Sequence, residues 1–214
     1  MPRRWTSRIG SSKETSSSAP SAPEELPSTF TDGLTLPTLF VFDLDYTLWP
    51  FWVDTHVTPP LKAVEDGTKA KDRLGEQFAF YDQVSDILVG LRQSGIKIAA
   101  ASRSQAPELA REMLRLLRIS PDGLPSEKSI DFFDDLQIYS ASKTTHFQKI
   151  HERTGIPYDE MLFFDDEMRN RDVETLGAIM YLVRDGVTRE EVDNGVWSWR
   201  KRTKGDREKR VQEP

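Results

Sequence analysis

The stretch of sequence that decides the fold is Leu39-Phe-Val-Phe-Asp43-Leu-Asp45-Tyr-Thr47-Leu-Trp49-Pro50. Its first four residues are large and apolar, and such a short run is typical of a buried β-strand. Side chains alternate along a strand, so Asp43 and Asp45 leave it toward one side while Leu44 points the other way. Two carboxylates at the mouth of a buried sheet repel each other and lose hydration. A fold keeps them there when a cation or a reaction uses them.

Outward from this stretch, apolar runs alternate with amphipathic ones. Further strands are predicted at 96–101, 136–139, 161–164 and 178–183. Helices are predicted at 109–117, 144–154 and 188–199, and Gly155 is typical of a helix C-cap. Strands that alternate with helices predict an α/β fold, with a mainly parallel central sheet covered on both faces. Ligands of such sheets bind beyond the carboxyl ends of the strands.

Polar residues end four of these predicted strands or follow them closely. They are, in chain order, Asp43 and Asp45, Ser102, Lys143, and Asp165 and Asp166. In a parallel sheet they gather at one edge. Up to four carboxylates in one cleft call for a hard cation with oxygen ligands, and Mg²⁺ fits best because it bridges carboxylates to phosphate oxygens. With the lysine and the hydroxyl, the set predicts a phosphoryl-transfer site.

Each residue of the set also has a purely structural interpretation. Ser102 could be a helix N-cap, Lys143 a solvated residue at a helix start, and Asp165-Asp166 the cap of a helix over 169–176. The catalytic interpretation rests on their order at successive strand ends. In it, one aspartate acts as the nucleophile and forms an aspartyl-phosphate. An aspartate two residues on protonates the leaving group and then activates water.

The composition limits the classes of protein that remain. The 214 residues suggest one domain with tails, and the net charge of −6 argues against a nucleic-acid-binding surface. The chain has no cysteine, which excludes disulfides and thiolate catalysis. No apolar stretch approaches the roughly 20 residues that span a membrane. Residues 1–36, rich in Ser, Thr and Pro, are predicted to be a disordered tail, and the charged residues 200–214 a solvated one.

The four motifs resemble, in order, those of the haloacid-dehalogenase (HAD) superfamily, and within it the eukaryotic magnesium-dependent phosphatase family. The similarity is close over 41–56 and continues in 99–103, 142–147 and 163–170. It covers roughly residues 37–195. It implies a three-layer, Rossmann-like domain over 37–199, with a small insert after the first strand and no large cap. Only about 40 residues separate the first motif from the next helix, too few for a second core.

The resemblance also implies a role for each site residue. Asp43 is the nucleophile and a metal ligand, and Asp45 is the general acid/base and a metal ligand through its backbone carbonyl. Asp165 and Asp166 hold Mg²⁺, with Asp166 the preferred direct ligand and Lys143 a partner of Asp165. The phosphoryl group is bound by Ser102, Lys143, Arg103 and Leu44.

The substrate implied is a phosphate monoester, phosphotyrosine-like or on a sugar, carried by a protein or a small molecule. Ring side chains near the first motif either line the mouth of the site or fasten the insert to the core: Tyr46, Trp49, Phe51, Trp52, His56 and Tyr81. Trp197 and Trp199 are expected to pack the last helix against the body. A receiver-like module, a catalytically silent binding protein and a phosphomutase remain as alternatives. We expect a monomer in the cytoplasm; the nucleus is a further possibility, and the basic, Ser-rich start leaves organelle targeting open.

Overall fold

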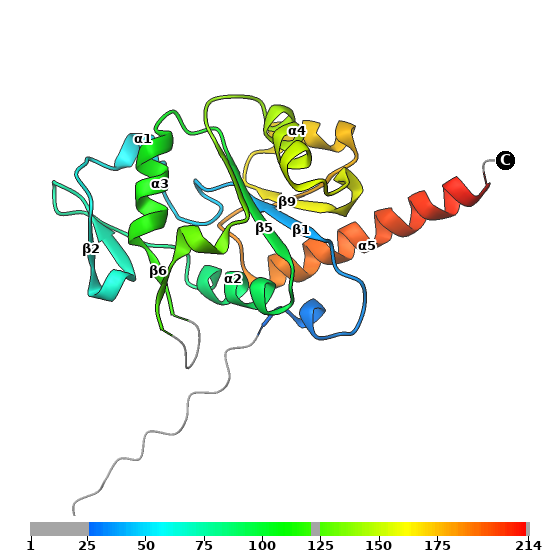
Figure 1. Cartoon of the computed structure of the whole chain (residues 1–214), viewed down its shortest axis with the longest axis horizontal. Coiled ribbons are helices and arrows are strands. Elements are labelled where there is room, and N and C mark those ends of the chain that lie inside the picture. Colours follow the sequence, from blue (N-terminus) through cyan, green and yellow to red (C-terminus); the bar gives the residue numbers. More distant parts are fainter. Residues whose placement is uncertain (1–25, 121–124, 213–214) are drawn as a thin grey trace, which may run out of the picture.

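A five-stranded parallel sheet forms the centre of the computed structural model, which describes residues 26–120 and 125–212, with side chains up to residue 203. The strand order is β10-β9-β1-β5-β8 (Figure 1). The strands are β1 (Leu39–Phe42), β5 (Lys97–Ser102), β8 (Asp135–Ile138), β9 (Met161–Asp165) and β10 (Ile179–Leu182). Every neighbouring pair is parallel. All five strands lie at the predicted places, and the α/β fold class is confirmed.

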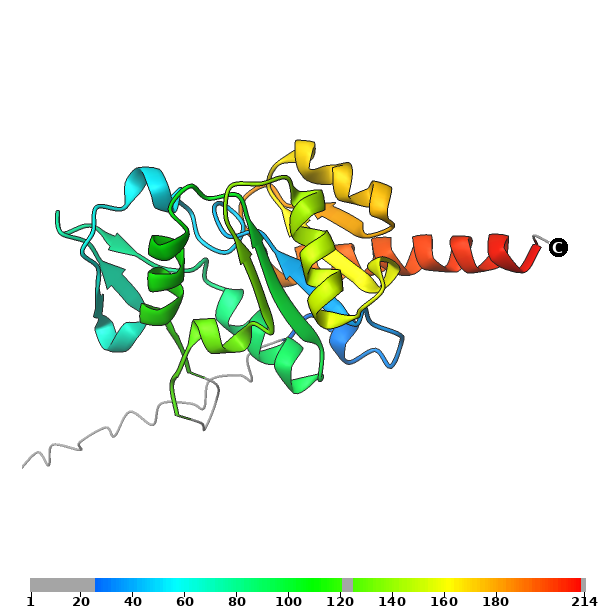
Figure 2. The same cartoon turned by 45° about the horizontal axis from the view of Figure 1, so that its top comes forward.

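Helices cover both faces of this sheet, as Figures 1 and 2 show. Because successive residues of β1 point to opposite faces, Phe40 and Phe42 belong to one core cluster, and Leu39 and Val41 to another. The first cluster includes residues of α2 (Val84–Gln93), α3 (Pro107–Leu116) and α5 (Arg189–Gln212). The second includes residues of α4 (Lys143–Thr154) and the 3₁₀-helix η5 (Met168–Leu176). The result is the predicted three-layer sandwich.

The ends of α4 show how local sequence positions a site residue. Ser142 is the N-cap, and its hydroxyl accepts a hydrogen bond from the Thr145 amide at 3.1 Å. Gly155 ends the helix in the left-handed conformation at φ 70°, as its position in the sequence predicted. Lys143 is therefore fixed at the first turn of a capped helix, at the carboxyl edge of the sheet.

A small antiparallel sheet follows β1 and forms the predicted insert. Its strands are β2 (Lys62–Val64), β3 (Lys69–Lys71) and β4 (Gln77–Phe78). Trp49 stacks on Phe51 at 5.3 Å between ring centroids, and Phe51 meets Phe78 edge-on at 4.8 Å. These rings therefore fasten the insert to the core. The remaining elements are α1 (Val53–His56), β6 (Arg118–Ile119), β7 (Glu127–Lys128), η1 (Ser28–Phe30), η2 (Glu65–Gly67), η3 (Ser129–Phe132) and η4 (Tyr158–Glu160).

The inner boundary of each predicted tail lies too far inside the chain, because residues near both boundaries belong to the folded domain. Residues 26–36 were predicted to be disordered, yet Phe30 packs edge-on against Phe40 at 6.1 Å, and Thr29 is buried. The predicted C-terminal boundary at residue 200 falls inside α5, where Arg200 is buried and pairs with Asp32 at 2.6 Å. These long-range contacts compensate for the low apolar content on which both predictions relied. The predicted disorder and targeting of residues 1–25 lie outside the described residues.

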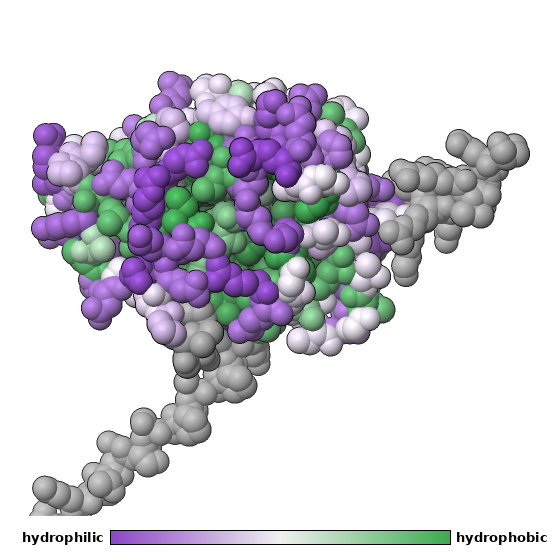
Figure 3. Space-filling model, viewed as in Figure 1, coloured by the Kyte–Doolittle hydropathy of each residue, from purple (hydrophilic) through white to green (hydrophobic). Residues whose placement is uncertain are grey.

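Hydrophilic residues, drawn in purple, cover much of the face shown in Figure 3, with hydrophobic residues between them. Within the described part of the chain, no helix has both the length and the apolar character needed to cross a membrane. At the last helix, Trp199 is buried and donates its indole N–H to the Asp159 carbonyl at 2.8 Å. Trp197 is 44% exposed, so of the two tryptophans only Trp199 packs as predicted.

Candidate active site

A cleft of about 400 Å³ opens at the carboxyl ends of the central strands. Its lining includes residues from the ends of β1, β5 and β9 and from the start of α4. Six of the predicted site residues line it: Asp43, Asp45, Ser102, Arg103, Lys143 and Asp166. Asp165 lies beside them, fully buried. The convergence at one sheet edge follows from strand register, because Phe42 pairs with Phe164 and brings Asp43 next to Asp165.

Lys143 forms the centre of the polar cluster. Its ammonium group donates to Asp43 Oδ1 at 2.6 Å and to the carbonyl of Ala101, and it lies 2.9 Å from Asp165 Oδ2. Burial by itself lowers the pKa of Lys143, but the charges of Asp43 and Asp165 outweigh it and raise the pKa above its ordinary value. The lysine is therefore a buried cation. Its predicted pairing with Asp165 is confirmed, and its interpretation as a solvated helix-start residue is wrong.

Three carboxylates meet beside this lysine. One oxygen each of Asp43, Asp165 and Asp166 lie within 4.8 Å of one another. Burial raises the pKa of Asp43 well above its usual range, against the opposing effect of Lys143, and Asp165 raises it further. Burial raises the pKa of Asp166 to about 6, and the charge of Asp165 adds to the effect. One lysine leaves this negative charge only partly neutralised, so the donor set fits a hard divalent cation such as Mg²⁺.

Asp165 and Asp166 differ in how free they are to bind an ion. Both oxygens of Asp165 accept hydrogen bonds from the Asn170 amide at 2.9 Å, and Oδ1 also accepts from the Glu167 backbone N–H at 2.7 Å. Asp166 is half-buried and lines the cleft. The geometry favours Asp166 as the direct ligand and gives Asp165 the task of holding Lys143. Asp165 orders the turn before η5, but the N-cap of η5 is Glu167 and no side chain caps it, so the interpretation of Asp165-Asp166 as a helix cap is wrong.

Asp45 is oriented by the turn that follows it. Its Oδ1 accepts from the Trp49 indole N–H at 2.7 Å and from the Val53 backbone N–H at 3.2 Å. Burial raises the pKa of Asp45 to about 6, although these hydrogen bonds oppose the shift. A carboxyl that titrates near 6 can both give and take a proton near neutral pH. The Asp45 side chain is not one of the three clustered carboxylates, which is compatible with the prediction that Asp45 contacts the metal through its backbone carbonyl.

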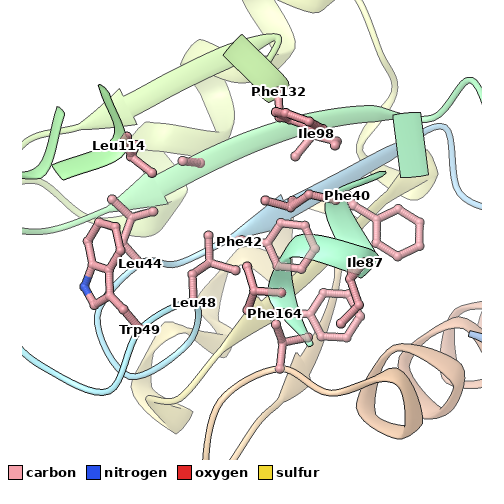
Figure 4. Packing of buried hydrophobic residues seen from close by; sticks show 14 of the residues in the cluster. Phe40, Phe42, Leu44, Leu48, Trp49, Ile87, Ile98, Leu114, Phe132 and Phe164 are labelled. Atoms are coloured by element: carbon pink, nitrogen blue, oxygen red, sulfur yellow. The ribbon is translucent and has the colours of Figure 1, made fainter. Parts of the chain in front are cut away.

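The predicted phosphate ligands divide into those that face the cleft and one that does not. Ser102 is buried, and its oxygen accepts from the Ser104 amide at 3.2 Å, which leaves its hydrogen free to donate. Because α3 begins only at Pro107, Ser102 is not its N-cap. The side chain of Leu44 is buried in the core (Figure 4), so it cannot bind a phosphate. Alternation along the strand turned it inward, and only its backbone N–H remains for that role.

Sequence reasoning gave no role to Asn170. This buried residue lines the cleft, holds Asp165 and accepts a hydrogen bond at Oδ1 from exposed Arg103 at 3.2 Å. It therefore ties the loop after β5 to η5, the 3₁₀-helix that follows β9. The available signal was its spacing: an amide five residues after Asp165, one helical turn into the next element.

The ring side chains near the first motif separate into two groups. Trp49 and Phe51 are buried and belong to the core, whereas Trp52 is 51% exposed and lines the cleft. His56 is exposed and stacks on Trp52 at 5.6 Å between ring centroids. Tyr81 is directed toward Asp185, whose carboxylate lies 3.5 Å from its hydroxyl.

Comparison with known proteins agrees with this geometry. Residues 35–202 match the Acid Phosphatase family. A HAD-like hydrolase superfamily protein of Schizosaccharomyces pombe is 44% identical over 147 residues, which are 68% of this chain and 85% of that protein. Magnesium-dependent phosphatase 1 of Homo sapiens is 41% identical over 171 residues, 79% of this chain and 91% of that protein. The chain belongs to the magnesium-dependent phosphatase family of the HAD superfamily.

Solved structures place this phosphatase in the same fold. A HAD-superfamily hydrolase from Ehrlichia chaffeensis superimposes with a TM-score of 0.53 at 12% identity, covering 78% of this chain and 98% of that one. At this identity the similarity concerns the fold alone. The family resemblance and the HAD-like fold predicted from the four motifs are both confirmed.

Proposed function

We propose that this magnesium-dependent phosphatase hydrolyses phosphate monoesters through an aspartyl-phosphate on Asp43. The observation that supports the proposal most directly is the placement of Asp43: it lines the cleft, 2.6 Å from the buried Lys143 and within reach of two further carboxylates. The family assignment favours a hydrolase over the receiver-like and catalytically silent alternatives.

The reaction needs two displacements at phosphorus. In the first, a carboxylate oxygen of Asp43 bonds to phosphorus, the bond to the ester oxygen breaks, and Asp45 gives its proton to that leaving oxygen. In the second, Asp45 takes a proton from a water molecule that attacks the phosphorus, and the bond to Asp43 breaks. Inorganic phosphate leaves, and both aspartates return to their starting states.

The remaining residues supply charge and orientation. Mg²⁺, held by Asp43, Asp166 and the Asp45 carbonyl, would neutralise the charge of the phosphoryl oxygens. Lys143 offsets the charge of Asp43, so the nucleophile and a phosphate dianion can approach each other. Ser102 donates its free hydroxyl hydrogen to a phosphoryl oxygen, together with the Leu44 backbone N–H and Arg103. Asn170 and Asp165 keep Lys143 in place.

The substrate class proposed is a phosphotyrosine-like or sugar phosphate. Among the described residues, none from the small insert at Lys62–Phe78 lines the cleft, so the mouth is left uncovered. A phosphate on a protein surface and a phosphate on a small sugar can both reach Asp43.

The proposal is tested by hydrolysis of p-nitrophenyl phosphate, followed as release of inorganic phosphate so that a mutase is distinguished. Turnover is expected to need Mg²⁺, to stop with a chelator, and to fall at least about a thousandfold in Asp43→Asn, because the amide cannot act as the nucleophile. Asp131→Asn, at an exposed acid at the opposite end of β8, is the matched control. Undiminished turnover in Asp43→Asn would exclude the mechanism.

A further inference from the structure

Trp52 is the exposed aromatic ring of the candidate active site. It is 51% exposed and lines the cleft, among polar and charged side chains such as Asp54, Thr55 and Gln105. Its neighbours Trp49 and Phe51 are buried. A large ring left in water beside a catalytic cleft offers a flat apolar surface to whatever enters.

The position of this ring is fixed before any ligand arrives. His56 lies against Trp52 at 5.6 Å between centroids with an interplanar angle of 16°. Tyr46 meets it edge-on at 5.1 Å and 75°. The Trp52 backbone N–H donates to His56 Nδ1 at 3.0 Å, which holds the histidine in its stacked position. A ring supported in this way loses little freedom when a ligand stacks on it.

The backbone of Tyr46 carries a second sign of function. Its φ is 54°, in the left-handed region that non-glycine residues, and bulky ones above all, avoid. The Tyr46 N–H donates to the Trp49 carbonyl at 2.8 Å, which holds the strained turn. Strain of this kind clusters at ligand-binding sites. Here it occurs directly after Asp45 and sets the Tyr46 ring against Trp52.

Polar groups surround the exposed ring. Asp54 Oδ2 accepts from the Gln105 backbone N–H at 3.3 Å, so α1, which follows Trp52, is fastened to the loop after β5. Asp54, Thr55 and Gln105 line the same cleft and can hydrogen-bond to substituents of a bound ring. An aromatic platform with such neighbours suits a flat or saturated ring that carries hydroxyl groups.

We propose that Trp52 is a specificity-determining residue, which stacks on the ring of the leaving group and makes the enzyme prefer ring-bearing phosphate monoesters to linear ones. The inference rests on the proposed function and refines its substrate class. The shared chemistry is a six- or five-membered ring close to the ester oxygen, bonded to it directly in aryl phosphates and through one CH₂ group in fructose 6-phosphate. Tyr46 and His56 act as positioning residues for the indole.

The test compares kcat/KM for three substrates in Trp52→Ala, Trp52→Phe and the parent enzyme. Phosphotyrosine and fructose 6-phosphate carry rings, and glycerol 2-phosphate does not. Trp52→Ala is expected to lower kcat/KM about fivefold to tenfold for at least one ring-bearing ester, and less than about twofold for glycerol 2-phosphate. Trp52→Phe should retain most of the ring preference. Trp197→Ala removes a comparably exposed indole on α5, which does not line the cleft, and serves as the matched control.

Loss with phosphotyrosine alone assigns the platform to aryl esters, and loss with fructose 6-phosphate alone assigns it to sugars; either supports the proposal. Equal loss for all three substrates, or no loss for either ring ester, overturns it. In those cases Mg²⁺-dependent hydrolysis of glycerol 2-phosphate by the parent still tests the proposed function separately, because that substrate needs no platform.

Discussion

Lys143 and Lys97 both lie 2.6 Å from an aspartate oxygen, but in opposite surroundings. The side chain of Lys143 is 1% exposed between Asp43 and Asp165, whereas that of Lys97 is 57% exposed beside Asp134. Lys143→Met leaves two buried carboxylates without their cation and should lower the free energy of unfolding by about 3–5 kcal/mol. Urea unfolding in the presence of a chelator measures this. Lys97→Met is the control and should stay within about 0.5 kcal/mol, because exposed pairs contribute little; similar losses in both variants would contradict this account.

His146 should make the protein sensitive to acid. Burial lowers the pKa of His146 to about 4, and the nearby Lys143 contributes, whereas the ordinary value is 6.5. Its Nε2 bonds to the Tyr139 carbonyl, and Nδ1 is buried with no partner within the described structure, so the native state holds the neutral ring. As pH falls below 6.5, the unfolded state binds a proton that the native state refuses until about pH 4. Stability contributed by the neutral ring is therefore present above pH 6.5 and is lost between pH 6.5 and 4.

His146→Gln keeps a donor for the Tyr139 carbonyl but cannot titrate. The difference in unfolding free energy between parent and variant should shift by up to about 3 kcal/mol in favour of the variant from pH 6.5 to pH 4. The raised pKa values of Asp43, Asp45 and Asp166 act in the opposite direction, but they are common to both proteins and cancel in this difference. Parallel stability curves would show that the histidine is not buried in its neutral form.

At the scale of single residues, the sequence revealed those placed by strand ends. The convergence of Asp43, Asp45, Ser102 and Asp166 on one cleft was predictable because an apolar run followed by a polar residue is visible in the local sequence. The sequence could not distinguish the exposed Trp52 from the buried Trp49, because the exposure of each side chain depends on where the insert packs. Leu44 was assigned to phosphate binding from the family pattern, although alternation along β1 sends its side chain into the core.

At the scale of elements, the strands of the central sheet were predictable, whereas the strands inside the predicted insert were not. The parallel strands are continuous apolar runs, since both faces of the sheet are covered. Strands β2–β4 have only two or three residues each and include Lys62, Lys69 and Lys71, so no apolar period marks them. The contacts of Phe51 and Phe78 and the turn between β3 and β4 stabilise them instead.

Asp72 holds that turn. It is buried and accepts backbone hydrogen bonds from Thr58 at 3.1 Å, Leu74 at 2.9 Å and Glu76 at 3.0 Å. Asp72→Ala leaves these donors unpaired and should destabilise the protein by about 1–3 kcal/mol, measured by thermal unfolding. Glu76→Ala, at an exposed side chain in the same turn, should have little effect. Phosphatase activity at low temperature should be retained in both, because the insert supplies no lining residue; a large loss of kcat in Asp72→Ala would mean that the insert shapes the site.

At the scale of the whole molecule, Arg200 joins the two ends of the described chain. Its guanidinium group bonds to Asp32 at 2.6 and 3.0 Å and to the Thr35 carbonyl at 2.9 Å, and lies over the Trp197 ring at 4.8 Å. Figures 1 and 2 show α5, which carries it, running beside this segment and then away from the body. The composition of a segment describes only neighbouring residues, so it cannot predict the contact between Arg200 and Asp32, which are 168 positions apart. For this reason both predicted tails included residues that belong to the folded domain.

Arg200→Met should lower the free energy of unfolding by about 2–3 kcal/mol, because charge-assisted hydrogen bonds of a buried group are lost. It should also expose residues 26–36 to limited proteolysis. Lys201→Met, at the exposed next position, is the matched control. Equal protease resistance in the two variants would show that other contacts, such as those of Asp193 with Ser28 and Thr29, suffice to hold the segment.

Within the described residues, the insert leaves the mouth of the cleft uncovered, and this has a consequence for the kinetics. Enzymes that close a lid over their substrate include a conformational step in each catalytic cycle, and a viscogen added to the buffer can slow this step. Here the side chains around Asp43 are already positioned before a phosphate binds. The kcat measured at saturating substrate should therefore not change when glycerol is added to the buffer. The uncovered mouth also lets bulk water reach the proposed aspartyl-phosphate. This access favours rapid hydrolysis of the intermediate over its accumulation.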